Sequence, residues 1–305
     1  ISLKGMFGRM ILVTGITGHS GRYFLQELKN SKYENTIRCI VRETSKIDIL
    51  QNCGLKVETC FGDLNDEAFL DKCMKGIDTV VHIASIRYSK KIIKAAIDNQ
   101  VKRAVCVHTT GIYSKFKAAS EEYKAIDRTL KEMIEGTDIQ LTILQPTMIY
   151  GDMCDHNMSR FIKMVDKLKL FPVINHGSCM IQPVNARDLG KAYYQVLTIP
   201  ADKAGTLYNL SGDKPIQLIE VLRIISNTLG KRTIFISFPL WLGVLLARTA
   251  KILTLGKIDY IEKIQRMSED RCFSHEDAEK DFGYKPCFFS EGILAEINEY
   301  ISQKS

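Results

Sequence analysis

The feature that most constrains this chain is a glycine-containing turn between an apolar run and an amphipathic segment, close to its start. Residues 10–14 are apolar and form a run of strand length, and the apolar positions after Gly21 recur with helical spacing. Between them stand Gly15, Gly18 and Gly21. Glycine permits a tight turn, a close approach of backbone amides to a ligand, and close packing of helix on strand. The segment therefore predicts a strand–turn–helix unit whose helix N-terminus receives the phosphates of a dinucleotide.

Strand-like and helical segments alternate regularly from Met10 to about Tyr150. The expected strands are short and rich in β-branched and aliphatic residues: 10–14, 36–41, 57–62, 79–83, 104–108 and 140–145. The helical patterns between them include 21–29, 67–74, 90–99 and 118–135. Such apolar runs indicate strands buried on both faces, and therefore parallel strands covered by helices. We predict an α/β fold, a doubly wound parallel sheet of the Rossmann type, with a smaller C-terminal substrate lobe.

The C-terminal half has a different pattern, because the regular alternation ends after Gly151. The patterns that remain are a helix, a strand and a helix, at 187–197, 206–210 and 217–229. We expect a dinucleotide-binding domain formed by residues 1–150, to which residues 188–210 return. Residues 151–187 and 211–305 are expected to form the substrate lobe.

One segment of this half, 238–248, is almost entirely apolar and ends at Arg248. Its apolar run is shorter than the roughly 20 residues that a transmembrane helix needs, and Lys251 follows soon after. We therefore predict no membrane span. The segment is expected to form a helix that packs within the substrate lobe or lines its mouth.

Composition limits the partners and the compartment. The formal net charge is +7, and the lysines and arginines are scattered without a dense cluster. This argues against nucleic acid as a partner and favours small anionic molecules such as phosphates. Nine cysteines form no C-x-x-C pair, as expected in a reducing cytoplasm. The histidines show no zinc-type spacing, so no metal site is predicted. The oligomeric state stays open.

The glycine segment 14–21 reads T-G-x-x-G-x-x-G and resembles the loop of extended and atypical short-chain dehydrogenases, the epimerase/dehydratase group. Further landmarks follow in the order of that family: Gly62-Asp63-Leu64, the strands 80–85 and 105–111, and the segments 144–151, 182–189 and 208–212. Each match is short, but together they extend over nearly the whole chain. One position departs from the pattern, since Gln145 stands where arginine is usual.

The resemblance implies an oxidoreductase or an epimerase/dehydratase that uses NAD(P) and acts on a hydroxyl or carbonyl group, for example of a nucleotide sugar. It also implies that Asp63 receives the amino group of the adenine. The cofactor-binding positions indicated by the loop and by the resemblance are Gly15, Thr17, Gly18, His19, Ser20, Gly21, Asp63, Leu64, Ile83, Ala84, Ser85, Pro146, Thr147 and Ile149.

The choice between NAD and NADP depends on the residue that meets the ribose 2′-position. NAD-binding folds of this kind place an acidic residue there, about twenty positions beyond the glycines. Here the strand 36–41 is followed by Arg42, with Ser45 and Lys46 close behind. A guanidinium can grip a 2′-phosphate with two hydrogen bonds. We therefore predict NADP, bound by Arg42 with Arg22 assisting; NAD is the alternative if these cations are merely solvated.

The catalytic centre is where the chain departs most from the family. The resemblance implies a tyrosine that exchanges a proton with the substrate, and a lysine four residues later on the same helix face. Counted back from Gln145, the tyrosine falls at Tyr123, but Asp127 stands at the lysine position. A carboxylate there opposes ionisation of a phenol, whereas a lysine favours it.

A second frame, Tyr113 with Lys117, fits Y-x-x-x-K literally but lies directly after a strand, earlier than the helix of the family. Tyr123 is the preferred candidate, and Thr109 or Thr110 is expected to orient the substrate. The missing lysine leaves two hypotheses: an NADP-dependent enzyme, or a dinucleotide-binding regulator or assembly subunit that has lost catalysis.

Overall fold

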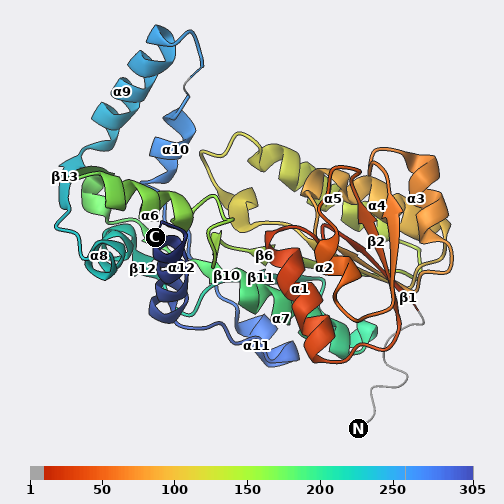
Figure 1. Ribbon diagram of the computed structural model, residues 1–305. Helices are drawn as coiled ribbons and strands as arrows, with labels where there is room; N and C mark the ends of the chain where they lie inside the picture. Colours follow the sequence, from red (N-terminus) through yellow and green to blue (C-terminus); the bar gives the residue numbers. More distant parts are fainter. Residues whose placement is uncertain (1–9, 258, 305) are drawn as a thin grey trace.

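The computed structural model describes residues 10–257 and 259–304, so the first nine residues of the predicted domain lie outside it. Its centre is a seven-stranded sheet in the order β11-β6-β5-β4-β1-β2-β3, in which every neighbouring pair is parallel (Figure 1). The strands are β1 (Met10–Thr14), β2 (Thr36–Val41), β3 (Val57–Phe61), β4 (Thr79–His82), β5 (Arg103–Val107), β6 (Gln140–Pro146) and β11 (Leu207–Leu210).

Both faces of the sheet are covered, because successive apolar side chains of a strand point in opposite directions. In β1, Ile11 and Val13 join one hydrophobic core and Leu12 joins the other. Helices α1 (His19–Asn30), α2 (Asp48–Gln51), α7 (Ala186–Thr198) and α11 (Glu276–Phe282) contribute to the first core. Helices α3 (Glu67–Met74), α4 (Ser89–Asp98) and α5 (Ser120–Ile134) contribute to the second. The predicted doubly wound parallel sheet is confirmed.

The segment after the first six strands comes back to this sheet. Strand β11 pairs in parallel with β6, from Leu207 opposite Ile143 to Leu210 opposite Pro146. Helix α7 precedes β11 and packs along α1 on the same face of the sheet. The chain then leaves the sheet again at Ser211.

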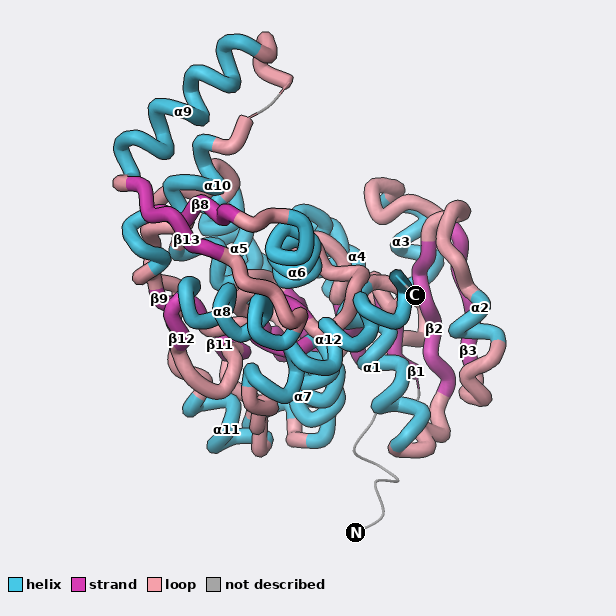
Figure 2. Tube along the Cα trace, turned by 60° about the vertical axis from the view of Figure 1, so that its left-hand side comes forward, coloured by secondary structure: helices cyan, strands magenta, loops and turns pink. Residues whose placement is uncertain are grey.

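A second body of the C-terminal half has its own hydrophobic core. Residues such as Ile162, Leu222 and Ile293 bring together α6 (Met158–Lys167), α8 (Leu218–Thr228) and α12 (Phe289–Lys304). Figure 2 shows these three helices gathered at one end of the sheet. Short strand pairs complete the lobe: β8 (Leu170–Ile174) with β13 (Ile234–Phe238), β9 (Met180–Ile181) with β12 (Ile216–Gln217), and β7 (Ile149–Tyr150) with β10 (Val184–Asn185).

The apolar segment 238–248 lies where we did not expect it. It opens α9 (Leu240–Leu253), which projects from the lobe and is joined to the body through α10 (Ile261–Arg266) (Figure 1). Most of its large apolar side chains are exposed, and only Gly243 and Ala247 of α9 are buried. The expectation that this helix packs inside the lobe was therefore wrong. No helix within 10–257 and 259–304 is long and apolar enough to cross a membrane.

Candidate functional site

The glycine loop joins β1 to α1 and has the backbone that its sequence requires. Gly15 has a φ of +75°, and a Cβ there would lie 2.6 Å from the backbone nitrogen of Ala84. A Cβ on Gly21 would lie 2.1 Å from the carbonyl oxygen of Gly15. Gly18 differs from both, because its only close neighbour would be that oxygen, at 3.1 Å. Gly15 and Gly21 thus allow the loop to pack closely on neighbouring backbone, whereas Gly18 faces open space.

This open space lies at the N-terminus of α1. Gly18 caps the helix, no described side chain bonds its first amides, and its first turn carries no acidic residue. The unpaired amides and the helix dipole make such an end favourable for phosphate. The loop therefore fits the pyrophosphate of a dinucleotide, since it offers donors and no side chain that would fill the space.

Arg42 follows β2, the strand next to β1, at the same edge of the sheet as the loop. Its side chain is exposed and forms no hydrogen bond or ion pair with any described residue. Asp63 follows β3 at that edge and is also exposed, with one carboxylate oxygen accepting the backbone and side-chain amides of Asn65. Both predicted ligands thus stand where a dinucleotide extended from the loop would pass.

Arg22 has a different partner from the one we expected. Its guanidinium donates to both carboxylate oxygens of Asp152, at 3.1 and 3.0 Å, and Tyr23 donates to the same group at 2.7 Å. The imidazole of His19 lies 3.3 Å away. Burial opposes ionisation of Asp152, but the nearby His19 ring and the hydrogen bond from Tyr23 outweigh it and hold the pKa of this carboxyl well below its usual range. These residues of α1 anchor the loop after β7.

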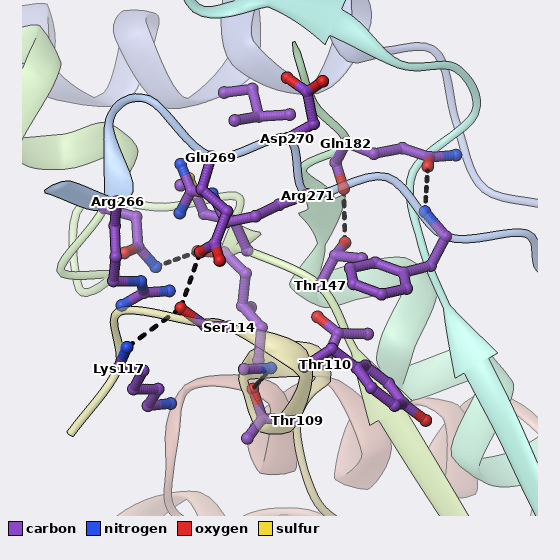
Figure 3. A pocket seen from close by; sticks show the side chains of 17 residues that line it. Thr109, Thr110, Ser114, Lys117, Thr147, Gln182, Arg266, Glu269, Asp270 and Arg271 are labelled. Atoms are coloured by element: carbon purple, nitrogen blue, oxygen red, sulfur yellow. Dashed lines mark hydrogen bonds between the residues drawn. The ribbon is translucent and has the colours of Figure 1, made fainter. Parts of the chain in front are cut away.

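A cavity of about 330 Å³ opens beside the ends of β5 and β6. Figure 3 shows side chains from well-separated parts of the chain directed toward this common space. Its lining comes from Thr109, Thr110, Gly111, Tyr113, Ser114, Lys117, Thr147, Met148, Ile149, Asn157, Ile181, Gln182, Arg266, Glu269, Asp270, Arg271 and Phe273. The cavity therefore brings together the predicted threonines and two predicted cofactor positions, Thr147 and Ile149, with a C-terminal segment that sequence reasoning did not identify.

Of the two candidate tyrosines, Tyr113 lines this cavity and Tyr123 is not among its described lining residues. Tyr123 is only 9% exposed, and its ring lies 4.7 Å from the Lys117 ammonium and 5.4 Å from the Arg87 guanidinium. Tyr113 is 47% exposed, and its hydroxyl donates to the Gln145 side-chain oxygen at 2.9 Å. The arrangement therefore favours Tyr113 as the group that meets a ligand.

Tyr113 and Lys117, the literal Y-x-x-x-K pair, meet different electrostatic surroundings. Burial and the nearby charge of Asp127 raise the pKa of Tyr113, although its bond to Gln145 opposes this. Burial, and then the nearby Arg266, lower the pKa of Lys117. The phenol is thus kept protonated, and Lys117 releases its proton more readily than an ordinary lysine.

Beneath Tyr113 lies a buried polar chain that explains both departures from the family pattern. Asp127 accepts from the His108 ring at 2.6 Å through one oxygen and from the Gln145 amide at 3.1 Å through the other. The second ring nitrogen of His108 bonds Ser89 at 2.9 Å. Asp127 and Gln145, which replace the usual lysine and arginine, are therefore hydrogen-bonded to each other, and Gln145 in turn orients Tyr113.

Two arginines of the cavity wall lack a close carboxylate partner among the described residues. Arg271 forms no ion pair there, and Arg266 reaches only Glu262, at 3.9 Å. The neighbouring acids are engaged elsewhere: Glu269 accepts from Ser114 and from the backbone of residue 115, both at 2.7 Å, and Asp270 accepts from the backbone of residue 180. The buried Nε atoms of both arginines have no described partner. Burial lowers the pKa of Arg271 because it disfavours the charged form, so an anionic ligand beside this guanidinium would stabilise it.

His82 is buried at the end of β4. Its ring bonds Thr14 at 2.6 Å and the Ser85 carbonyl at 3.2 Å, which joins the ends of β1 and β4 beside the glycine loop. Burial, and then the proximity of His108, lower its pKa to about 3. His82 is therefore an uncharged structural residue near neutral pH.

Comparisons with known proteins agree with this geometry. Residues 15–164 match the family model described as NAD(P)H-binding. A UDP-glucose 4-epimerase of Vibrio cholerae is 21% identical over 296 residues, covering 84% of this chain and 85% of its own.

Solved structures share the fold along nearly the whole chain. A UDP-glucose 4-epimerase of Thermotoga maritima, solved with UDP-glucose, has a TM-score of 0.74 at 13% identity and covers 97% of this chain and 100% of its own. The dTDP-glucose 4,6-dehydratase DesIV of Streptomyces venezuelae, solved with NAD, has a TM-score of 0.73 at 17% identity and covers 97% and 98%. Residues 15–164 therefore match the NAD(P)H-binding family model, and the chain shares its fold with nucleotide-sugar epimerases and dehydratases, the group that its motifs resemble.

Proposed function

We propose that this protein is an NADP-dependent oxidoreductase or epimerase/dehydratase acting on a hydroxyl or carbonyl group of a phosphate-bearing substrate of the nucleotide-sugar class. The observation that carries the proposal is that Arg266 and Arg271 line the same cavity as Thr109 and Tyr113, and that each arginine has a buried Nε with no described acceptor. A buried donor without an acceptor is costly, and an anionic ligand would supply one. A diphosphate is the anion that a nucleotide sugar supplies.

The cofactor half of the proposal rests on the glycine loop and Arg42. The loop and the α1 N-terminus hold the pyrophosphate, Asp63 meets the adenine, and Arg42 meets a 2′-phosphate with no described carboxylate competing for it. When bound, the nicotinamide supplies the hydride acceptor or donor. The cavity reaches the cofactor side through Thr147 and Ile149, which belong to the predicted cofactor positions.

The proton-transfer half assigns named roles to the groups that line the cavity. Tyr113 exchanges a proton with the reacting oxygen of the substrate, and Gln145, held by Asp127, orients its hydroxyl. Thr109 accepts the amide of Gly111 through its side-chain oxygen, so its own O–H is free to point toward the substrate. Thr110 donates to the Pro146 carbonyl at 3.2 Å and is therefore the positioning member of the pair.

The ligands of the related structures support this substrate class. The Thermotoga maritima epimerase was solved with UDP-glucose, and a further neighbour, MoeE5, was solved with UDP-glucose and NAD at a TM-score of 0.73 and 17% identity. Both proteins have the fold of this chain, and we therefore propose a ligand of the same chemical class for it.

The test is binding of UDP-glucose to the full chain in the presence of NADP⁺, measured by calorimetry. We expect Arg271→Gln to weaken binding by about tenfold or more, because a charged hydrogen bond to phosphate is lost. Arg223→Gln is the matched control, since Arg223 is exposed on α8 and away from the cavity lining. Equal affinity of Arg271→Gln and the unchanged protein, in a variant that retains its circular dichroism spectrum, would overturn the assignment.

A second function is favoured by one observation, namely that Asp127, and not a lysine, stands four residues after Tyr123 on α5. In that case the chain binds a dinucleotide and a ligand but does not catalyse. Turnover of NADP⁺ or NADPH with a panel of nucleotide sugars separates the two. Binding of both molecules without any turnover would favour the regulator or assembly subunit.

A further inference from the structure

The arm, which we define as residues 240–257 and 259–266, is rich in apolar residues but has little of its surface buried. It contains α9, α10 and their connection, and it projects from the substrate lobe in both views (Figures 1 and 2). Its exposed large apolar side chains are Trp241, Leu245, Leu246, Ile252, Leu253, Leu255 and Tyr260, with Leu255 reaching 92% exposure. Contiguous apolar surface of this kind marks an interaction site.

The buried side of α9 is narrow and already occupied. Gly243 and Ala247 are its buried residues, and a Cβ on Gly243 would lie 2.6 Å from Ile174 and 3.1 Å from Ile264 of α10. This face seats α9 on the lobe and on α10. The apolar residues named above lie on the remaining faces of α9 and at its tip, so intramolecular packing does not account for them.

The charge around these residues is mainly positive. From position 221 to position 258 the sequence contains no aspartate or glutamate, whereas the chain has 35 acidic residues in all. Within the arm this stretch carries Arg248, Lys251 and Lys257, all exposed. Asp259, just beyond it, pairs with Lys251 at 2.7 Å, which leaves Arg248 and Lys257 without a described ion-pair partner. An apolar surface with an excess of cations is complementary to anionic lipid headgroups.

The length of the arm determines how it meets a bilayer. Helix α9 has 14 residues, and about 20 are needed to cross the hydrocarbon core. A short apolar helix with cations and an exposed tryptophan lies in the interfacial plane instead, with its apolar side chains entering the headgroup region. We propose that the arm docks this protein on the surface of an anionic lipid bilayer without spanning it.

A second copy of the chain is the competing occupant, and charge disfavours it. In a two-fold dimer the same surface meets itself, so Arg248 and Lys257 of both copies would be brought together with no acidic residue of the stretch to compensate them. A membrane with negatively charged lipids presents the opposite charge to the same residues. The proposal rests on α9 and the exposed residues that follow it, not on Arg266, and is therefore independent of the proposed function.

The test uses the full chain and vesicles of phosphatidylcholine with or without a minority of phosphatidylglycerol. Trp241 is the only tryptophan of the chain, so its fluorescence reports the arm directly. We expect co-sedimentation with the anionic vesicles and a blue shift of the emission. Binding is expected to be weaker on neutral vesicles and to decrease as salt is added.

The variants distinguish vesicle binding through the arm from non-specific adsorption of the protein. Leu245→Asp is expected to weaken vesicle binding by about tenfold or more, because an apolar contact becomes an anionic one facing anionic lipid. The control is Leu294→Asp on α12, where a leucine of similar exposure (47% against 52%) lies outside the arm. Arg248→Gln tests the charge and is expected to reduce the difference between the two vesicle types.

Three outcomes would overturn the proposal. One is that the unchanged protein binds neither vesicle type. Another is that Leu294→Asp weakens binding as much as Leu245→Asp does, both variants being folded by circular dichroism. The third is a dimer in sedimentation analysis that Leu245→Asp dissociates, with no vesicle binding, which would assign the surface to a second copy.

Discussion

The glycine loop and the substrate cavity lie at the same edge of one sheet, yet they are built in different ways. The loop is contained in residues 14–21, and its main external contact is the backbone at Ala84. The cavity is assembled from four stretches of chain, 109–117, 147–157, 181–182 and 266–273. A site made of consecutive residues can be recognised from their order, whereas a site assembled by folding depends on contacts that no local pattern contains.

The sharpest test of the loop compares two of its glycines, and we expect it to give the largest effect. Gly18→Val should weaken dinucleotide binding by more than about a hundredfold, because the side chain enters the space of the pyrophosphate. Gly21→Ala should instead destabilise the fold, since its Cβ meets a backbone oxygen at 2.1 Å. Cofactor titration and thermal melts distinguish the two. A Gly18→Val protein with unchanged cofactor affinity would show that the dinucleotide binds elsewhere.

The corresponding test of the cavity compares its two tyrosines once a substrate is found. Tyr113→Phe removes the hydroxyl that faces the cavity and should lower kcat by roughly a hundredfold, the usual effect of losing a positioned acid–base group. Tyr123→Phe is the matched control and should have a much smaller effect, because Tyr123 is not among the described lining residues. If Tyr123→Phe alone abolishes turnover, our original preference for Tyr123 was right and the cavity is not the site of chemistry.

Arg42 tests whether a single exposed side chain sets the choice of cofactor. Arg42→Asp should narrow or reverse a preference for NADPH over NADH, at a cost to NADPH binding of about 2 kcal/mol, since a phosphate contact is replaced by repulsion. Arg22→Gln is the control, because Asp152 already engages its guanidinium. Equal dissociation constants for NADPH and NADH in the unchanged protein would rule out the NADP assignment.

The smallest effect is expected from the buried chain beneath Tyr113. Asp127→Asn leaves one of its two donors, His108 or Gln145, without a matching acceptor, and should lower the free energy of unfolding by about 1 kcal/mol. Asp138→Asn is the control, since Asp138 forms an exposed ion pair with Lys102 and such pairs contribute little. Denaturant melts measure both. Equal stability of the two variants would show that the hydrogen bonds beneath Tyr113 contribute no more to the free energy of unfolding than a surface ion pair does.

Much of the fold could be predicted, because its strands are continuous apolar runs and its helices have a regular apolar spacing. The strands at 10–14 and 36–41 and the helix at 67–74 have the bounds that the structure shows, and the other predicted strands of the sheet differ by a residue or two. These segments are buried by their own pattern: apolar residues on both faces of a strand need helices on both sides. Helix α9 was predicted as a helix but placed wrongly, since the number of its apolar residues says nothing of what covers them.

The candidate site was predicted only in part. Thr109, Thr110, Thr147 and Ile149 line the cavity, as does the tyrosine we ranked second. The segment with Arg266 and Arg271 lies more than a hundred residues further on and carries no motif. One signal in the sequence could have indicated the contact between Gln145 and Asp127. Both positions depart from the family pattern, as is expected when two residues in contact change together.

By itself, the sequence determined the doubly wound sheet and the dinucleotide loop, because hydrophobic periodicity and glycine stereochemistry act between residues close along the chain. Only the tertiary structure decided that Tyr113 faces the cavity, that Asp127 pairs with Gln145 and His108, that Arg266 and Arg271 line the cavity with buried Nε atoms that have no described acceptor, and that α9 stands exposed. Each of these depends on which distant side chains share a space, and burial and charge pairing arise only when the chain has closed around that space.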